Sequence, residues 1–216
     1  MSDNLIVIKE LSKRYGEIEV LHNINLAMKA GTIVGFVGRN GSGKTMLMKH
    51  ICGLVHPSEG EIWICGKKLE KRGEISDNIG AIIENPGFLP EYSGFQNLKL
   101  LAMIQRKITD EKIRETLKLV GLENAGKKHV GKYSLGMKQR LGIAQAIMEN
   151  PDILILDEPM NGLDNEGVEE VRTLLISLKE KGKLIIIASH TREDIELLCD
   201  EVYRMEKGKI EEIVLN

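Results

Sequence analysis

The residues with the clearest chemistry form a glycine-rich run at positions 38–45, which matches the pattern G-x-x-x-x-G-K-[ST]. Glycines reach backbone angles that are closed to other residues, so successive N–H groups can curl around phosphate oxygens. Lys44 supplies a positive charge for the β- and γ-phosphates, and Thr45 supplies a hydroxyl for Mg²⁺. The run therefore predicts a binding site for ATP or a similar nucleotide with Mg²⁺. Its residues are Gly38, Arg39, Asn40, Gly41, Ser42, Gly43, Lys44 and Thr45.

Acidic and imidazole side chains follow two later apolar runs. Asp157 and Glu158 come directly after residues 153–156, and His190 follows the run 184–188. If both runs are strands of a parallel sheet, these side chains meet at its ligand-binding edge, beside the glycine-rich loop. Asp157 would then hold Mg²⁺ and Glu158 would polarise the attacking water. Taken singly, these residues also fit an acidic strand end and a structural histidine.

Apolar periodicity indicates the elements that position these residues. Short apolar runs predict strands over 5–11, 20–28, 33–37, 61–65, 79–83, 153–156, 184–188, 202–205 and 210–214. Helical spacing predicts helices over 44–54, 134–148, 167–181 and 191–200, and around positions 98–102 and 113–120. Strands that alternate with helices favour an α/β fold with a parallel sheet, and residues 85–150 form a mostly helical insert.

Composition narrows the class of protein. A chain of 216 residues is long enough for one substantial α/β domain, and its net charge of −2 does not favour nucleic-acid binding. No apolar run approaches the ~18 residues that span a bilayer. The N-terminal residues do not resemble a signal peptide, and three widely spaced cysteines favour a reduced cytosolic compartment.

The segment 133–140, Tyr-Ser-Leu-Gly-Met-Lys-Gln-Arg, resembles the signature motif of ATP-binding cassette (ABC) proteins, whose usual form is L-S-G-G-Q followed by x-Q-R. Other family motifs stand in the same order. Tyr15 is where the family places an aromatic residue that stacks on adenine, residues 161–164 resemble the D-loop, and His190 resembles the switch histidine.

The resemblance implies one domain over residues 1–216 with a P-loop NTPase (RecA-like) core. That core comprises 1–84 and 151–216 and carries an N-terminal antiparallel β subdomain, while 85–150 form the helical subdomain. Two such chains would bind head to tail around two ATP molecules. Ser134 and Gly136 would face the partner's γ-phosphate, and the D-loop Asp164 would join the nucleotide site. The resulting cycle of ATP-driven dimerisation and hydrolysis would drive a separate membrane subunit, with the ATPase held on the cytoplasmic face of the membrane.

Three departures from the usual family pattern point to one branch. Leu135 replaces the first signature glycine, Met137 replaces the glutamine, and Glu84 stands where a glutamine usually follows the strand 79–83. These variants resemble the bacitracin- and lantibiotic-resistance branch of bacterial exporters. A carboxylate is a harder ligand than an amide for Mg²⁺, so we expect Glu84 to lie on the metal side of the site. The alternative is that Glu84 faces solvent while the ATP sites are open.

The segment 84–96 joins the nucleotide site to the helical insert. Gly87 and Gly94 would permit it to move. The apolar side chains of this segment would partly form a groove for a short helix of the membrane subunit, and partly pack into the insert's own core. They are Phe88, Leu89, Tyr92 and Phe95.

Two other classes of protein share some of these motifs. An ABC-type ATPase can serve DNA repair, chromosome structure or the ribosome, but such proteins usually carry a long coiled coil or two cassettes. An unrelated P-loop kinase or GTPase would leave the segments around Ser134, Asp164 and His190 unexplained. A transporter ATPase that works without nucleic acid is therefore the preferred prediction.

Overall fold

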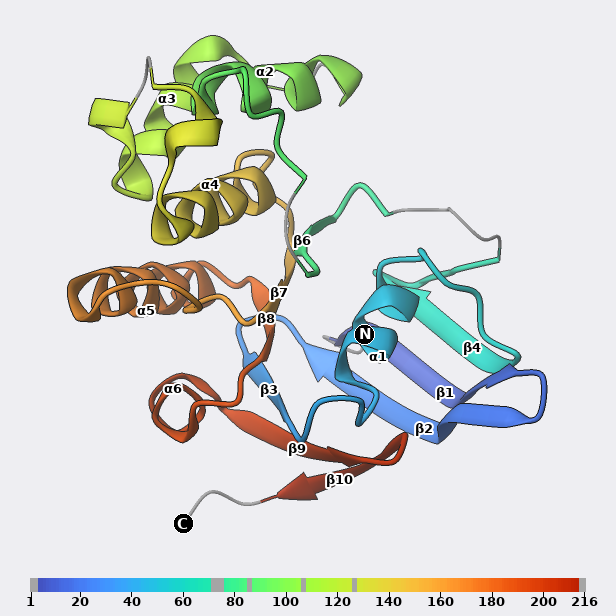
Figure 1. The fold of residues 1–216 in the computed structure, drawn as a ribbon. Coiled ribbons are helices and arrows are strands. Elements are labelled where there is room, and N and C mark those ends of the chain that lie inside the picture. The colour runs from blue at the N-terminus through green and yellow to red at the C-terminus, as the bar shows by residue number, and fades with distance from the viewer. Residues whose placement is uncertain (1–3, 71–75, 85–86, 106–107, 126–127, 214–216) are drawn as a thin grey trace.

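The computed structural model describes residues 4–70, 76–84, 87–105, 108–125 and 128–213, and two β-sheets organise them (Figure 1). The larger sheet has six strands in the order β10-β9-β3-β8-β7-β6. Five of these strands are parallel, and β10 pairs antiparallel with β9. The strands are β3 (Ile33–Val37), β6 (Ile79–Ile82), β7 (Ile153–Asp157), β8 (Leu184–Ala188), β9 (Glu201–Glu206) and β10 (Lys209–Ile213).

The smaller sheet is antiparallel and has the order β2-β1-β4-β5. Its first strand is longer than predicted, because pairing with β2 continues through several β-bulges to Tyr15, opposite Ile18. Residues 12–15, which lie beyond the predicted strand 5–11, therefore continue β1, and the hairpin turns at Gly16 and Glu17. The strands are β1 (Asn4–Tyr15), β2 (Ile18–Lys29), β4 (Glu59–Ile64) and β5 (Lys67–Lys68).

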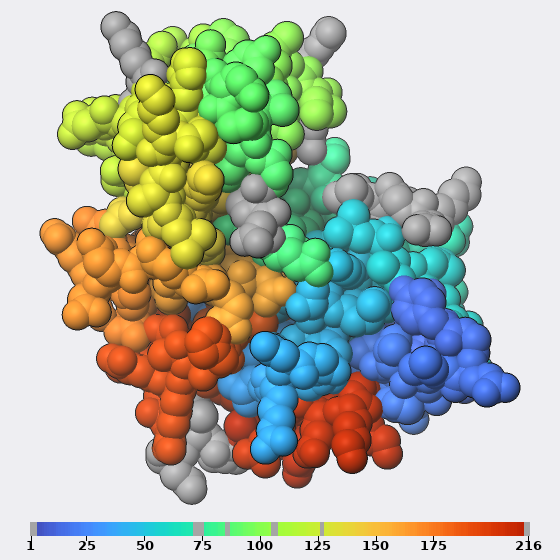
Figure 2. Space-filling view, viewed as in Figure 1, coloured from blue at the N-terminus to red at the C-terminus, as the bar shows by residue number. Residues whose placement is uncertain are grey.

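The helices divide into two groups. Helices α2, α3 and α4 lie together at one end of the molecule, where they make the upper part of the space-filling view (Figure 2). Helices α1, α5 and α6 pack beside the sheets (Figure 1). The helices are α1 (Lys44–Ile51), α2 (Gly94–Gln105), α3 (Asp110–Leu119), α4 (Leu135–Ile147), α5 (Asn165–Glu180) and α6 (Arg192–Leu198), with 3₁₀ turns at Glu123–Ala125 and Val130–Lys132.

The all-apolar runs of β7 and β8 are buried on both faces of the large sheet. Leu154 and Leu156 pack into a core shared with the helical group, whereas Ile153 and Ile155 pack into a second core with α1 and the small sheet. A strand that is buried on both faces needs a continuous apolar run rather than an alternating one. This explains why the sequence shows such runs immediately before Asp157 and before Ser189.

Gly94 has a different role from the flexible one that the sequence suggested. It begins α2 and is buried, and a Cβ atom there would lie 2.8 Å from the Tyr133 hydroxyl. Close packing rather than movement therefore requires glycine at this position. Gly87 is exposed with open space around it, and Asn85 and Pro86 of the predicted hinge lie outside the described residues.

Candidate nucleotide site

The predicted glycine-rich loop joins the end of β3 to the start of α1 and lines a cleft of about 800 Å³. Gly38, Gly41 and Gly43 have φ angles of 154°, 79° and 114°, which side-chain-bearing residues rarely adopt. A Cβ atom on Gly38 would also lie 2.3 Å from the Met205 carbonyl oxygen. The sequence therefore has glycine where the loop must turn, and α1 directs its positive end toward the loop.

The loop contains polar groups that suit a phosphate. The Lys44 ammonium is buried and donates to the carbonyl oxygens of Gly38, at 2.7 Å, and Arg39, at 3.3 Å. The Ser42 hydroxyl is buried and has no hydrogen-bond partner among the described residues. Because buried hydroxyls are normally hydrogen-bonded, this unused group is consistent with a loop that receives phosphate oxygens.

Two oxygen ligands of the kind that Mg²⁺ prefers meet beside the loop. The Thr45 hydroxyl donates to the Asp157 carboxylate at 2.8 Å, so the end of β7 is joined to the start of α1. Burial raises the pKa of the Asp157 carboxyl above its ordinary value, although the Thr45 hydrogen bond and the Lys44 charge oppose this shift. The described residues contain no group of three His, Cys, Asp or Glu residues suited to a metal. One carboxylate and one hydroxyl still fit Mg²⁺, which usually takes its other ligands from phosphates and water.

Glu158 and His190 also meet, as predicted for residues that follow strands of one parallel sheet. The Nδ1 atom of His190 lies 2.8 Å from the Glu158 carboxylate, and the Glu158 backbone N–H donates to the Ala188 carbonyl oxygen. Glu158 has a φ angle of 51°, a conformation that is uncommon for a residue other than glycine and that often occurs at functional sites. Glu158 lines the cleft, and the His190 side chain is 72% exposed.

Glu84 lines the same cleft but is already paired. Its carboxylate lies 2.8 Å from the Lys49 ammonium of α1, and 63% of its side chain is exposed. Glu84 thus lies at the nucleotide cleft, as expected, and is partly solvent-facing, as the alternative held. Its assignment to the metal remains a prediction.

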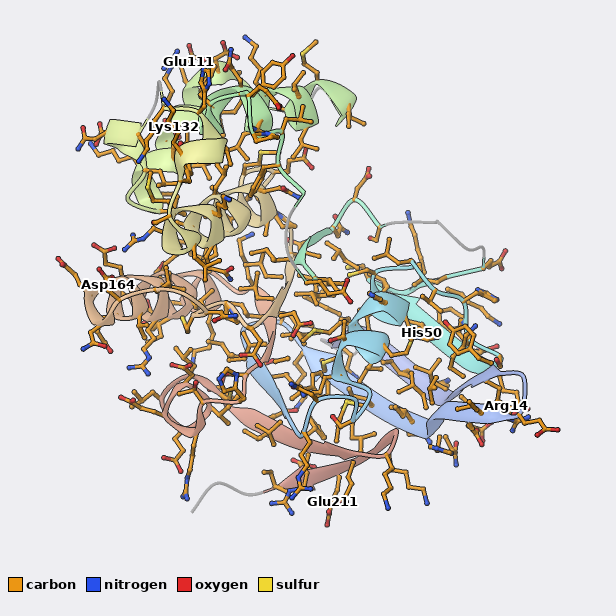
Figure 3. All side chains as sticks on the ribbon, in the orientation of Figure 1. Arg14, His50, Glu111, Lys132, Asp164 and Glu211 are labelled. Atoms are coloured by element: carbon orange, nitrogen blue, oxygen red, sulfur yellow. The ribbon has the colours of Figure 1, made fainter. Side chains whose placement is uncertain are left out.

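Outside the glycine-rich loop, four predicted binding residues do not line this cleft. Ser134 caps α4 by accepting from the Met137 N–H, and Asp164 caps α5 by accepting from the Gly167 N–H. Gly136 packs against the Gly162 carbonyl. Asp164 lies at the α5 side of the molecule, away from His50 on α1 (Figure 3). The signature and D-loop segments are therefore together on another part of the surface.

Tyr15 is the fourth of these residues. Its ring is half-exposed at the end of β1, its hydroxyl lies 4.0 Å from the sulfur of Met46, and the Lys13 ammonium lies 4.9 Å from the ring centre. Met46 itself lines the cleft, so Tyr15 is at the rim of the site. Its contact with adenine remains a prediction.

Leu135 shows how the chain accommodates a large residue at the first signature glycine position. Its side chain packs over Gly162, where an added Cβ atom would lie 2.5 Å from the Leu135 side chain. Leu135 is otherwise 59% exposed. A glycine in the D-loop thus provides the space that the unusual leucine needs.

Two contributors to the cleft were not assigned roles from the sequence. Gln139 of α4 donates its side-chain amide to the carbonyl oxygens of Glu158 and Pro159, both at 3.1 Å. Gly208, in the β9–β10 turn, donates its N–H to the Ser42 carbonyl oxygen at 2.9 Å. Gln139 could have been noticed because it belongs to the signature-like segment, whereas nothing in the local sequence around Gly208 indicates the contact.

Comparison with known proteins agrees with this geometry. The family model described as ABC transporter matches residues 21–161. The chain is 47% identical over 207 residues to the uncharacterized ABC transporter ATP-binding protein YybJ of Bacillus subtilis, covering 96% of this chain and 95% of that one. It is 44% identical over 208 residues to the bacitracin transport ATP-binding protein BcrA of Bacillus licheniformis. That match covers 95% of this chain and 68% of BcrA. The solved dimeric structure of MJ0796, a bacterial ABC transporter cassette, superposes on this chain with a TM-score of 0.85 and is 26% identical to it. The match covers 98% of this chain and 100% of MJ0796.

Proposed function

The chain belongs to the ABC transporter family, and from that premise we propose that it is the ATP-binding and ATP-hydrolysing subunit of a bacterial exporter for peptide antibiotics. The observation that carries the ATPase assignment is the meeting of three chain segments, two of which line one cleft while the third contacts Glu158 of that cleft. Lys44 and Thr45 come from the glycine-rich loop, Asp157 from the end of β7, and His190 contacts Glu158 from the loop after β8.

Each residue has a defined task in this proposal. Lys44 neutralises charge on the β- and γ-phosphates, and Thr45 and Asp157 would hold Mg²⁺, which supplies further charge neutralisation when bound. Glu158 orients and polarises the water that attacks the γ-phosphate, and His190 keeps the Glu158 carboxylate in position. Positioning and electrostatic stabilisation of this kind account for most of the catalysis of phosphoryl transfer.

A second copy of the chain would complete the site. Ser134 and Gly136 stand at the start of α4 and do not line the chain's own nucleotide cleft. A helix start favours anions, so these residues suit the γ-phosphate bound by a partner chain. The similarity to the dimeric cassette MJ0796 supports this arrangement.

The proposed transport function needs separate membrane subunits. No helix among the described residues has the length and apolar character to cross a membrane. Leu89 and Tyr92 expose 46% and 42% of their surface in the loop before α2, and we assign this loop to the contact with the membrane subunit. The choice of peptide antibiotics as cargo rests on the similarity to the bacitracin transport protein.

Replacing Lys44 tests the ATPase assignment. Lys44→Ala removes the ammonium group that is held within the phosphate loop, so we expect ATP hydrolysis by the purified chain to fall by about 100-fold or more. Lys118→Ala, which removes an exposed ammonium near the end of α3, is the control. Near-parental hydrolysis by the Lys44 variant would refute the site.

A growth experiment tests the transport assignment. Cells that carry the chain with its membrane partner should tolerate more bacitracin than cells that carry the Glu158→Gln variant with the same partner. If the parental chain hydrolyses ATP but changes no resistance to bacitracin or a lantibiotic, the exporter assignment fails while the ATPase assignment stands.

A further inference from the structure

A buried ion pair joins α5 to α6 directly beneath the loop that carries His190. The Arg172 guanidinium donates to one Asp194 carboxylate oxygen from Nη2, at 2.6 Å, and from Nε, at 3.1 Å. The side chains are only 8% and 3% exposed. Glu169 and Glu193 add contacts to Arg172 Nη1 at 2.5 and 3.4 Å. The geometry fixes the position of the Asp194 carboxylate.

The second oxygen of Asp194 reaches the loop itself. The Ser189 hydroxyl lies 3.4 Å from Asp194 Oδ2 and is placed to donate to it, and the same hydroxyl accepts from the Thr191 backbone N–H at 3.1 Å. Ser189 is only 2% exposed. These contacts hold the residues on both sides of His190, whose own side chain is mostly exposed and faces Glu158.

The start of α6 needs such an anchor. Thr191 is the N-cap residue of α6 but makes no side-chain capping bond, and the helix has only seven residues. Short helices are marginal without tertiary contacts, because forming the first turn is costly. In addition, the first N–H groups of a helix lack intrahelical partners. The Ser189 hydroxyl satisfies one of these N–H groups, and Asp194 holds the hydroxyl in place.

We propose that Arg172, Asp194 and Ser189 form a positioning relay that keeps His190 in contact with Glu158 for ATP hydrolysis. None of the three lines the nucleotide cleft, so they act through His190 and not on ATP. This inference rests on the proposed ATPase function. It predicts that weakening the relay lowers kcat while ATP binding is preserved.

The most informative variant is Ser189→Ala. It removes the link to the loop and leaves the ion pair intact, whereas breaking the pair would leave a buried unpaired charge and endanger folding. We expect Ser189→Ala to lower kcat about tenfold, since small displacements of catalytic groups have effects of this order or greater. ATP affinity should stay near parental, and the melting temperature should fall by only a few degrees, because one buried hydroxyl and its two hydrogen bonds are lost. Lys179→Met is the matched control. Lys179, like Arg172, is a cation of α5 that forms an ion pair, but its partner is Asp200 and the pair does not contact the His190 loop.

A double variant separates positioning from general loss of structure. His190→Ala is measured first, and its loss of hydrolysis shows that the proposed active site operates. In that background Ser189→Ala should cause no further loss, because the relay then has nothing to position. Arg172→Lys, which keeps the charge but not the paired donors, should lower kcat less than His190→Ala does. Additive losses in the double variant, or a parental kcat in Ser189→Ala, would overturn the proposal.

Hydrogen exchange provides a measurement that does not depend on activity. The Thr191 amide should exchange faster in Ser189→Ala than in the parental chain, while amides within α5 remain unchanged. If the chain showed no hydrolysis at all, the proposed function would fail, and this comparison would still decide whether the relay holds the loop. Unchanged protection of Thr191 would rule the relay out.

Discussion

At the scale of single residues, Glu84 is the most unusual feature of the site. Its carboxylate lies in the nucleotide cleft but contacts Lys49 rather than Thr45 or Asp157, the other predicted Mg²⁺ ligands. An ion pair this exposed contributes little to stability, so it is easily exchanged for another partner. We infer that Lys49 and Mg²⁺ compete for Glu84.

This competition can be measured by titrating Mg²⁺ at saturating ATP. Glu84→Gln should keep measurable ATPase activity but raise the Mg²⁺ concentration needed for half-maximal rate by up to about tenfold. Losing a group that supports a metal site typically lowers metal affinity by about tenfold or more. Lys49→Met should lower that concentration, because it frees the carboxylate. Superimposable curves for all three proteins would show that Glu84 does not act on the metal side.

Asp157 illustrates a conflict between stability and function. Burial raises the pKa of its carboxyl, so the folded chain holds the proton more tightly than the unfolded chain does. The ionised form therefore costs folding free energy at neutral pH, and this cost is absent below the ordinary carboxyl pKa, where both states are protonated.

Asp157→Asn should accordingly raise the melting temperature of the nucleotide-free chain at pH 7 while lowering Mg²⁺-dependent hydrolysis by about 100-fold or more. The gain in melting temperature should shrink as the pH is lowered. Asp152→Asn is the control, because Asp152 is an exposed carboxylate just before the same strand. A destabilised Asp157→Asn protein at pH 7 would contradict the argument.

At the scale of elements, the loop before α2 combines a fixed backbone with exposed apolar side chains. The Tyr92 carbonyl oxygen accepts from the Val130 N–H at 2.9 Å, while its side chain remains 42% exposed. By contrast, Phe88 and Phe95 pack against the core that the helical group shares with the large sheet, so this part of the segment packs inward. Exposed apolar side chains on a fixed backbone suit a docking surface.

Placing a charge on this surface tests it. Tyr92→Glu should abolish antibiotic resistance in cells and leave basal ATP hydrolysis by the purified chain within about twofold of parental, since surface substitutions rarely disturb folding. Leu119→Glu is the matched control, because Leu119 is an equally apolar and 60% exposed residue at the end of α3. Full resistance in cells with Tyr92→Glu would place the docking surface elsewhere.

At the scale of the whole molecule, the two halves of the expected ATP site lie on different parts of one chain. Lys44 and Asp157 line the cleft, whereas Ser134 and Gly136 belong to a separate surface at the start of α4. A head-to-tail pair of chains would bring the two surfaces together, and ATP would then link them.

Glu158→Gln should trap this pair. The substitution keeps a side-chain oxygen near His190 but removes the base, so ATP should bind and remain unhydrolysed. Size-exclusion chromatography should show a dimer with ATP and a monomer without it. Adding Ser134→Asp should abolish the dimer, because aspartate can still cap α4 but repels the partner's phosphate. A Glu158→Gln chain that stays monomeric at saturating ATP, also with its membrane partner, would argue against the sandwich.

The sequence by itself determined the fold class and the motif residues that are proposed to bind ATP. The glycine-rich loop, the apolar runs before Asp157 and Ser189, and the signature-like segment are local patterns whose geometry follows from backbone sterics and strand burial. The predicted α/β fold is confirmed by the parallel sheet and by the similarity to solved cassettes.

Only the tertiary structure decided the contacts between segments far apart in the chain. It pairs Glu84 with Lys49, packs Gly94 against Tyr133, and joins Arg172 to Asp194. Local periodicity specifies which face of an element is buried but not which side chain lies opposite, because that depends on how the elements pack together. For this reason the motifs indicated the nucleotide site, whereas the residues that hold its parts in place became visible only in the fold.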